Sequence, residues 1–137
     1  MGKRFFLKRV TDVDKVIEIF FTISPEDDWP GRETSLYWIL YDKDKPCGVS
    51  IATPIDKNVL YAAFGGLTRS ARGKKLHRRL IAVRERYGRA NGFTKLITYT
   101  LTTNGPSIYN LLKNGYKIYD PQNPYQGTDV VYFIKDL

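Results

Sequence analysis

The stretch from residue 59 to residue 101 reads as a strand, a basic turn containing glycine, a helix and a second strand. The apolar side chains that recur at helical spacing are Leu76, Leu80, Val83 and Tyr87. This spacing predicts a helix over 74–90, and the β-branched and aromatic residues at 93–101 predict the strand after it. Two strands joined through a helix normally pair in parallel, with a right-handed crossover. The stretch therefore predicts a sheet with at least one parallel pair.

The residues before this stretch predict an antiparallel part of the same sheet. A strand over 3–10 precedes a helix that starts at Thr11 or Asp12, because either side chain can accept hydrogen bonds from the free amides of a first turn. Three apolar runs separated by short turn signals follow, which is typical of an antiparallel meander. These runs span 36–41, 47–53 and 59–67. Gly65-Gly66 is expected to interrupt the third run, as a bulge or a close backbone approach.

The last third of the chain predicts one short helix and two strands. Asn104 begins this helix and Gly115 follows its end, with strands at 116–119 and 130–134. The element order is then β-α-β-β-β-α-β-α-β-β, an α+β fold with a mixed sheet in a single domain over 1–137. A chain of 137 residues can bury an ordinary core without disulfides or metal.

Positive charge is concentrated in one segment. The chain has a formal net charge of +8, and segment 69–89 accounts for it. Its cations are Arg69, Arg72, Lys74, Lys75, Arg78, Arg79, Arg84, Arg86 and Arg89, against Glu85 alone. An anion is expected to dock there, and a nucleotide phosphate, a nucleic acid backbone or an acidic protein would each satisfy this charge.

The cysteine and histidine counts and the first nine residues indicate the cellular compartment. Cys47 is the only cysteine, so no disulfide can form within the chain, and with a single histidine no structural zinc site is expected. Cys47 is expected to be a small apolar strand residue rather than a nucleophile. The first nine residues return to charge after three apolar ones, too few for a signal peptide or a membrane span. These features predict a cytoplasmic protein without a membrane partner.

The turn before helix 74–90 supplies a sharper hypothesis. The first turn of a helix leaves amide N–H groups unpaired and carries a partial positive charge, so it can hold a pyrophosphate. Arg72, Lys74 and Lys75 flank these amides, and Gly73 lets a ligand approach the backbone. This arrangement predicts a nucleotide phosphate site at 72–77.

The same segment resembles the acyl-CoA-binding motif of the GNAT superfamily of N-acetyltransferases, which is Arg or Gln, two residues, Gly, one residue, then Gly or Ala. Arg72 matches the first position, and Lys75 and His77 stand at the two small-residue positions. A second similarity follows in the family's later segment, carried by Asn104, Ser107, Lys113, Gly115 and Tyr116. Together with the element order, the two motifs span most of the chain.

The resemblance implies a sheet that splays into a V, with acetyl-CoA lying in the opening and no metal. It implies that the pantetheine arm pairs with the strand ending near Leu67, that the amides of 72–77 hold the pyrophosphate, and that Asn104 lies near the sulfur. The residues it assigns to the cofactor are Leu67, Arg69, Arg72, Gly73, Lys74, Lys75, Leu76, His77 and Asn104. The implied reaction is acetyl transfer to a primary amine of a small molecule or a protein.

Two departures from the family pattern leave the catalytic residues unassigned. Leu111 stands seven residues after Asn104, where many members have the tyrosine acid, and Tyr109 should point elsewhere on the helix. The strand 59–67 carries no carboxylate base. The alternative is therefore a GNAT-fold protein without catalysis, such as a phage accessory protein, that binds nucleic acid or a protein through 69–89. A nucleobase-modifying member of the fold is a third option.

Several side chains keep two interpretations. The acidic loop residues Glu26, Asp27 and Asp28 could attract a cationic amine, although a solvated loop is the favoured interpretation. His77 is expected at the surface or near the phosphates rather than as a base. The tyrosines that could line an acceptor cleft are Tyr37, Tyr99 and Tyr125.

Overall fold

A seven-stranded sheet organises the computed structural model, which describes residues 4–127 and 129–137. Along the chain the elements are β1 Phe5–Val10, α1 Val13–Ile23, β2 Leu36–Asp42, β3 Lys45–Pro54, β4 Val59–Leu67, a 3-10 turn at Arg69–Ala71, α2 His77–Ala90, β5 Lys95–Leu101, α3 Gly105–Lys113, β6 Lys117–Ile118 and β7 Val130–Asp136. This is the predicted order with the 3-10 turn added. The α+β class and the mixed sheet are confirmed.

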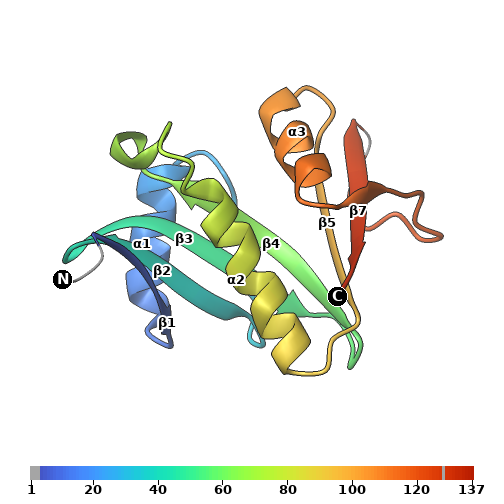
Figure 1. The fold of residues 1–137 in the computed structure, drawn as a ribbon, viewed down its shortest axis with the longest axis horizontal. Helices are drawn as coiled ribbons and strands as arrows, with labels where there is room; N and C mark the ends of the chain where they lie inside the picture. Colours follow the sequence, from blue (N-terminus) through green and yellow to red (C-terminus); the bar gives the residue numbers. More distant parts are fainter. Residues whose placement is uncertain (1–3, 128) are drawn as a thin grey trace.

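The sheet divides into two arms. Its strand order is β1-β2-β3-β4-β5-β7-β6, and β4 with β5 is the parallel pair, while the other neighbours are antiparallel. The parallel pairing lasts only from Val59 to Tyr61 on β4, opposite Lys95 to Ile97 on β5. Beyond Tyr61 the strands diverge, so that β5, β7 and α3 stand apart from β1–β4 (Figure 1). The splay that the resemblance implied is confirmed.

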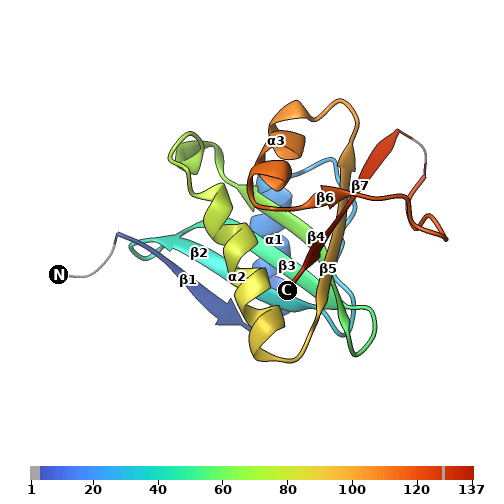
Figure 2. The same ribbon diagram turned by 45° about the vertical axis from the view of Figure 1, so that its right-hand side comes forward.

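Helices α1 and α2 cover opposite faces of the β1–β4 arm (Figures 1 and 2). On the α1 face, Val16 and Ile19 pack with Ile39 and Ile51. On the α2 face, the buried residues that pack together include Leu60, Ile81, Val83, Leu96 and Phe133. Because β2 and β3 are covered on both sides, they read as nearly continuous apolar runs rather than as alternating ones.

Some predicted boundaries were wrong. Helix α2 starts at His77 rather than at residue 74, because Gly73 and Lys75 have φ angles of +76° and +60° that a right-handed helix cannot contain. The turn predicted over 42–46 is tighter, since β3 already begins at Lys45. Strand β5 starts two residues later than predicted and β6 is two residues long, while residue 3 of the first predicted strand lies outside the described residues.

The prediction for Gly65-Gly66 is half right. Strand β4 runs through both glycines without interruption, and its register shift lies earlier, opposite Ile51 and Ala52. The close approach is real, because a Cβ on Gly66 would lie 2.6 Å from the ring of Phe64. The register shift at Ala63 and the close packing at Gly66 therefore lie three residues apart on the same strand.

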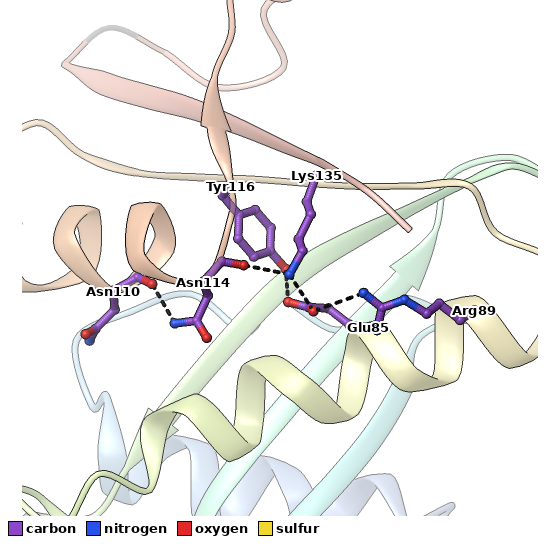
Figure 3. A network of polar contacts seen from close by, with 6 residues as sticks. All are labelled: Glu85, Arg89, Asn110, Asn114, Tyr116 and Lys135. Atoms are coloured by element: carbon purple, nitrogen blue, oxygen red, sulfur yellow. Dashed lines mark hydrogen bonds and ion pairs between the residues drawn. The ribbon is translucent and has the colours of Figure 1, made fainter.

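A polar network connects the two arms at the base of the splay (Figure 3). Glu85 on α2 accepts from the Tyr116 hydroxyl at 3.1 Å and pairs with Lys135 of β7 at 2.8 Å. The Lys135 ammonium also donates to the Asn114 carbonyl at 2.6 Å, and Arg89 adds a looser contact to Glu85 at 3.7 Å. Burial raises the pKa of Tyr116, so its hydroxyl stays protonated and can donate. The network joins α2, the end of α3 and β7.

Within the part of the chain that the structure describes, every helix is too short or too polar to cross a membrane.

Candidate active site

The second half of β4 has one unpaired edge. The Thr68 amide donates to the Cys47 carbonyl of β3. Backbone polar groups alternate between the two sides of a strand, so those of Gly65 and Leu67 face away from β3, toward the splay. Side chains from the following turn contact both carbonyls, with the His77 Nε2 3.1 Å from the Gly65 oxygen and the Arg72 Nε donating to Leu67 at 3.3 Å. This edge can pair with an extended ligand.

Two adjoining cavities lie along this edge. The smaller has a volume of about 490 Å³, and it is lined by Ile23, Ser24, Phe64, Gly65, Gly66, Leu67, Arg72, Gly73, His77, Asn104, Pro106, Ser107 and Asn110. The larger, of about 730 Å³, extends between the arms. Phe64, Gly65, His77 and Ser107 line both, so they mark where the two cavities join.

The nine predicted cofactor residues do not share one environment. Those that line the smaller cavity are Leu67, Arg72, Gly73, His77 and Asn104. Arg69, Lys74 and Lys75 are exposed outside its lining. Leu76 is buried in the core against Leu80, so only its backbone can serve a ligand.

The turn before α2 forms a concave set of backbone donors. Lys75 is left-handed and Leu76 right-handed. Alternation of this kind makes successive N–H groups converge into a nest that binds anions. Leu76 is the N-cap of α2 and makes no side-chain capping hydrogen bond. The amides at this end therefore lack a side-chain acceptor, and the predicted phosphate site has suitable geometry.

Replacing Lys75 with glycine is expected to stabilise the protein by about 0.5–1 kcal/mol. A non-glycine residue in the left-handed region is disfavoured by about 1–2 kcal/mol, and the greater freedom of glycine in the unfolded chain cancels part of the gain. Urea denaturation measures the difference. Lys74→Gly is the matched control, because Lys74 has no positive φ, and it should destabilise the protein. Equal effects of the two substitutions would refute the explanation.

His77 was expected at the surface or near the phosphates, and the structure gives it a partly exposed position at the start of α2, in the lining of the smaller cavity. Its ring is half-buried between β4 and α2, facing Gly65, and the Nδ1 atom is buried without a partner among the described residues. Burial lowers the pKa of His77 below 6.5, and the nearby Arg84 lowers it further. The ring is therefore neutral at pH 7.

This lowered pKa predicts acid sensitivity. Below pH 6.5 the unfolded chain binds a proton that the folded His77 resists, so unfolding takes up a proton and stability falls with decreasing pH. The contribution of His77 to the free energy of unfolding should be fully present well above pH 6.5 and should be lost as the pH falls below that value. His77→Gln should flatten that decrease, since His77 is the only histidine. Denaturation midpoints at several pH values measure this, and an unchanged slope in the variant would contradict it.

Helix α3 lacks the tyrosine that many members of the GNAT superfamily have as proton donor. Leu111 is buried and lines the larger cavity, so an apolar side chain stands at the position expected for the acid. Tyr109 is 63% exposed, which confirms that it points elsewhere. The helix has one other hydroxyl, that of Ser107, which lines both cavities. Asn104 caps the helix, accepting from the Ser107 amide at 3.2 Å.

The larger cavity contains some of the candidate acceptor residues. Asp27, Asp28 and Tyr99 line it, whereas Glu26 is outside its lining. Tyr37 is buried, stacks on Trp29 and lines a separate cavity instead. Tyr125 packs against the cavity residue Tyr61.

Among the residues of this cavity that the sequence did not single out are Tyr61 and Arg84. Arg84 was counted among the basic side chains of segment 69–89, but it is only 5% exposed. The missed signal was its spacing, one turn after Leu80 on the apolar stripe of α2. Burial raises the pKa of Tyr61, so its hydroxyl stays protonated.

Other residues behave as expected or carry no site. Cys47 is buried in β3, as expected for a small apolar strand residue, and burial raises the pKa of its thiol. Over residues 4–127 and 129–137, no group of three His, Cys, Asp or Glu side chains is placed to hold a metal ion.

Solved structures with the same architecture are acetyltransferases. An acetyltransferase from Streptococcus agalactiae is 16% identical, with 99% of this chain and 100% of that chain covered and a TM-score of 0.77. The ribosomal-protein-S18-alanine N-acetyltransferase of Escherichia coli is 14% identical, covering 96% and 93%, with a TM-score of 0.79. A GNAT family acetyltransferase from Elizabethkingia anophelis with acetyl-CoA bound is 11% identical, covering 99% and 100%, with a TM-score of 0.73. The fold is that of the acyl-CoA N-acyltransferases.

The family follows from the sequence comparison. The model of the acetyltransferase (GNAT) family matches residues 9–116, and no curated protein sequence matches the chain significantly. This chain belongs to the GNAT family of acetyltransferases. Membership places it among the acyltransferases, as the motifs at 72–77 and 104–116 predicted.

Proposed function

We propose that this protein transfers an acetyl group from acetyl-CoA to a primary amine. The observation that carries the proposal is the unpaired edge of β4 at Gly65 and Leu67, which leads directly to the amide nest at Lys75 and Leu76. An extended amide-containing arm fits the edge, and a pyrophosphate fits the nest. Gly65 and Leu67 line the smaller cavity, and so do Gly73 and His77, which stand on either side of the nest.

The residues present fit acetyl-CoA, whose role is to supply an activated acyl thioester. Arg72 is exposed and lines the cavity, so its guanidinium can contact a phosphate. The hydrogen bonds of His77 and Arg72 to the β4 carbonyls occupy the edge in this conformation. Pairing of a pantetheine amide with Gly65 requires the His77 ring to turn away, which its neutral state makes easier.

The reaction needs positioning and two proton movements. Once the bound ammonium has released a proton to water, the amine nitrogen bonds to the thioester carbonyl carbon, the carbon–sulfur bond breaks, and one further nitrogen proton is lost while the thiolate gains one. The products are an amide and a free thiol. Ser107 lines the junction of the cavities, and we assign it the proton donation that Leu111 cannot provide. Asp27 and Asp28 line the larger cavity, where an ammonium ion would be attracted.

Calorimetry with coenzyme A tests the proposal. Binding with micromolar Kd is expected, together with release of thiol when acetyl-CoA and an accepted amine are mixed with the protein. Ser107→Ala should then lower kcat about 100-fold or more with little change in Kd for coenzyme A, as expected for a lost general acid. Absence of coenzyme A binding would overturn the proposal.

The binding-module alternative predicts a different result. Duplex DNA affinity would fall steeply with salt if many cations of segment 69–89 neutralised phosphates. The structure leaves fewer cations free on that surface, because Arg84 is buried and Arg79 donates to the Phe5 carbonyl at 3.2 Å. We also propose that the chain is a single domain, which the one continuous sheet supports. We further propose that it works in the cytoplasm, which is consistent with a sequence that has one cysteine and therefore no internal disulfide.

A further inference from the structure

Arg84 is a buried cation without a counter-ion. It lies on α2, lines the larger cavity and is 5% exposed. Its Nη1 donates to the Phe64 carbonyl at 2.7 Å, while its Nε is buried without a hydrogen-bond partner. No carboxylate among the described residues forms an ion pair with it. Its neighbour Glu85 is occupied by Tyr116 and Lys135.

This arrangement is unfavourable unless a ligand completes it. An unpaired buried charge is strongly disfavoured, and a single neutral acceptor offsets little of that penalty. Burial lowers the pKa of Arg84, but a guanidinium remains charged in proteins at neutral pH. An apolar side chain of similar length would fill the same space without this penalty. An anionic group in the cavity would pair with the guanidinium through a charge-assisted contact.

The position of Arg84 indicates which molecule carries the anion. Arg72, Gly73 and Asn104 line the smaller cavity, whereas Arg84 lines only the larger one. The phosphates of the cofactor are expected at the other end of the groove, so they cannot supply the counter-ion. The acceptor therefore carries it.

We infer that the acceptor is an amino acid whose carboxylate binds Arg84 and whose amine lies beside β4. This inference rests on the proposed acetyl transfer. Arg84 contacts the carbonyl of Phe64, next to the edge at Gly65. A carboxylate on the guanidinium is thus within one residue of that edge, and an amine on the adjoining carbon reaches the junction of the cavities. The cavity of about 730 Å³ has room for a molecule of this size.

Matched pairs that differ only in the carboxylate test the inference. The pairs are tyrosine and tyramine, histidine and histamine, tryptophan and tryptamine, and lysine and cadaverine. Affinity is measured by calorimetry with and without coenzyme A, and acetylation by thiol release. In at least one pair the carboxylated member should bind 10-fold or more tightly than the decarboxylated one, a typical difference for a charge-assisted contact.

Variants of Arg84 separate ligand binding from a structural role. Arg84→Met should abolish the preference for the carboxylate and raise the Tm, because it removes an unpaired buried charge. Arg84→Lys should keep part of the preference. Arg86→Met is the control, since Arg86 is exposed on the same helix, and it should leave the preference unchanged.

The outcomes are distinguishable from failure of the proposed function. Coenzyme A binding without any carboxylate preference overturns the amino acid inference alone. A carboxylate preference that Arg84→Met removes, found without any coenzyme A binding, supports an amino acid site at Arg84 and overturns the proposed acetyl transfer. A preference retained in Arg84→Met, or a variant that loses stability and keeps the preference, assigns Arg84 a structural role and refutes the inference.

Discussion

Replacing Glu85 with alanine is expected to lower the free energy of unfolding by about 3 kcal/mol or more. The Glu85 side chain is 8% exposed. It accepts a hydrogen bond from the Tyr116 hydroxyl and forms an ion pair with Lys135, whose side chain is 19% exposed. Breaking a buried ion pair by removing one partner leaves the other charge uncompensated, and such changes typically destabilise by about 3–5 kcal/mol. Because the network joins the two arms (Figure 3), the loss affects the whole sheet. Chemical denaturation followed by circular dichroism measures it.

Two companion variants make the Glu85 result specific. Glu85→Ala combined with Lys135→Met should be less destabilising than the sum of the single changes, because neither charge then remains unpaired. Arg89→Ala should cost under about 1 kcal/mol, since the Arg89 side chain is 53% exposed and its contact is 3.7 Å. Additive effects of Glu85 and Lys135 would show that the pair is not coupled.

Arg72→Glu is expected to weaken coenzyme A binding about 100-fold, if the proposed function holds. Charge-assisted hydrogen bonds contribute about 1.5–3 kcal/mol, and a carboxylate at this position would also repel the pyrophosphate, so a change near 2.7 kcal/mol corresponds to that factor. The side chain lines the smaller cavity beside the nest. Calorimetry at fixed ionic strength measures the ratio of Kd values.

The matched control for this substitution is Arg86→Glu. It makes the same change in net charge on the exposed side of α2, outside the cavity linings. The affinity of this variant for coenzyme A should fall by less than about threefold, because solvent screens charges that are far apart. Similar losses in both variants would indicate long-range attraction rather than contact, and no loss in either would remove Arg72 from the phosphate site.

The sequence predicted the elements well where local rules dominate. The helical spacing of Leu76, Leu80 and Val83 and the cap at Asn104 are local signals, and the structure has helices there. The predicted start of α2 was wrong because Lys75 takes a left-handed conformation, which residue preferences would predict only for glycine. Propensity cannot reveal such a conformation, since the surrounding fold imposes it.

The site was predictable only in part. Of the nine residues predicted to contact the cofactor, Leu67, Arg72, Gly73, His77 and Asn104 line one cavity. Leu76 was predicted from its place in the motif, but its side chain packs in the core. The direction of a side chain depends on helix phase and on neighbouring elements, and a motif specifies neither.

The amino-acid sequence alone determined the element order, the parallel crossover at 59–101 and the position of the basic turn, because periodicity and turn residues act over short distances. Only the tertiary structure decided where the arms separate, which strand edge stays unpaired and that Arg84 is buried while Arg86 is exposed. Those features depend on which distant segments pack together. The chemical role of a buried charge depends on the groups around it, and only folding brings those groups together.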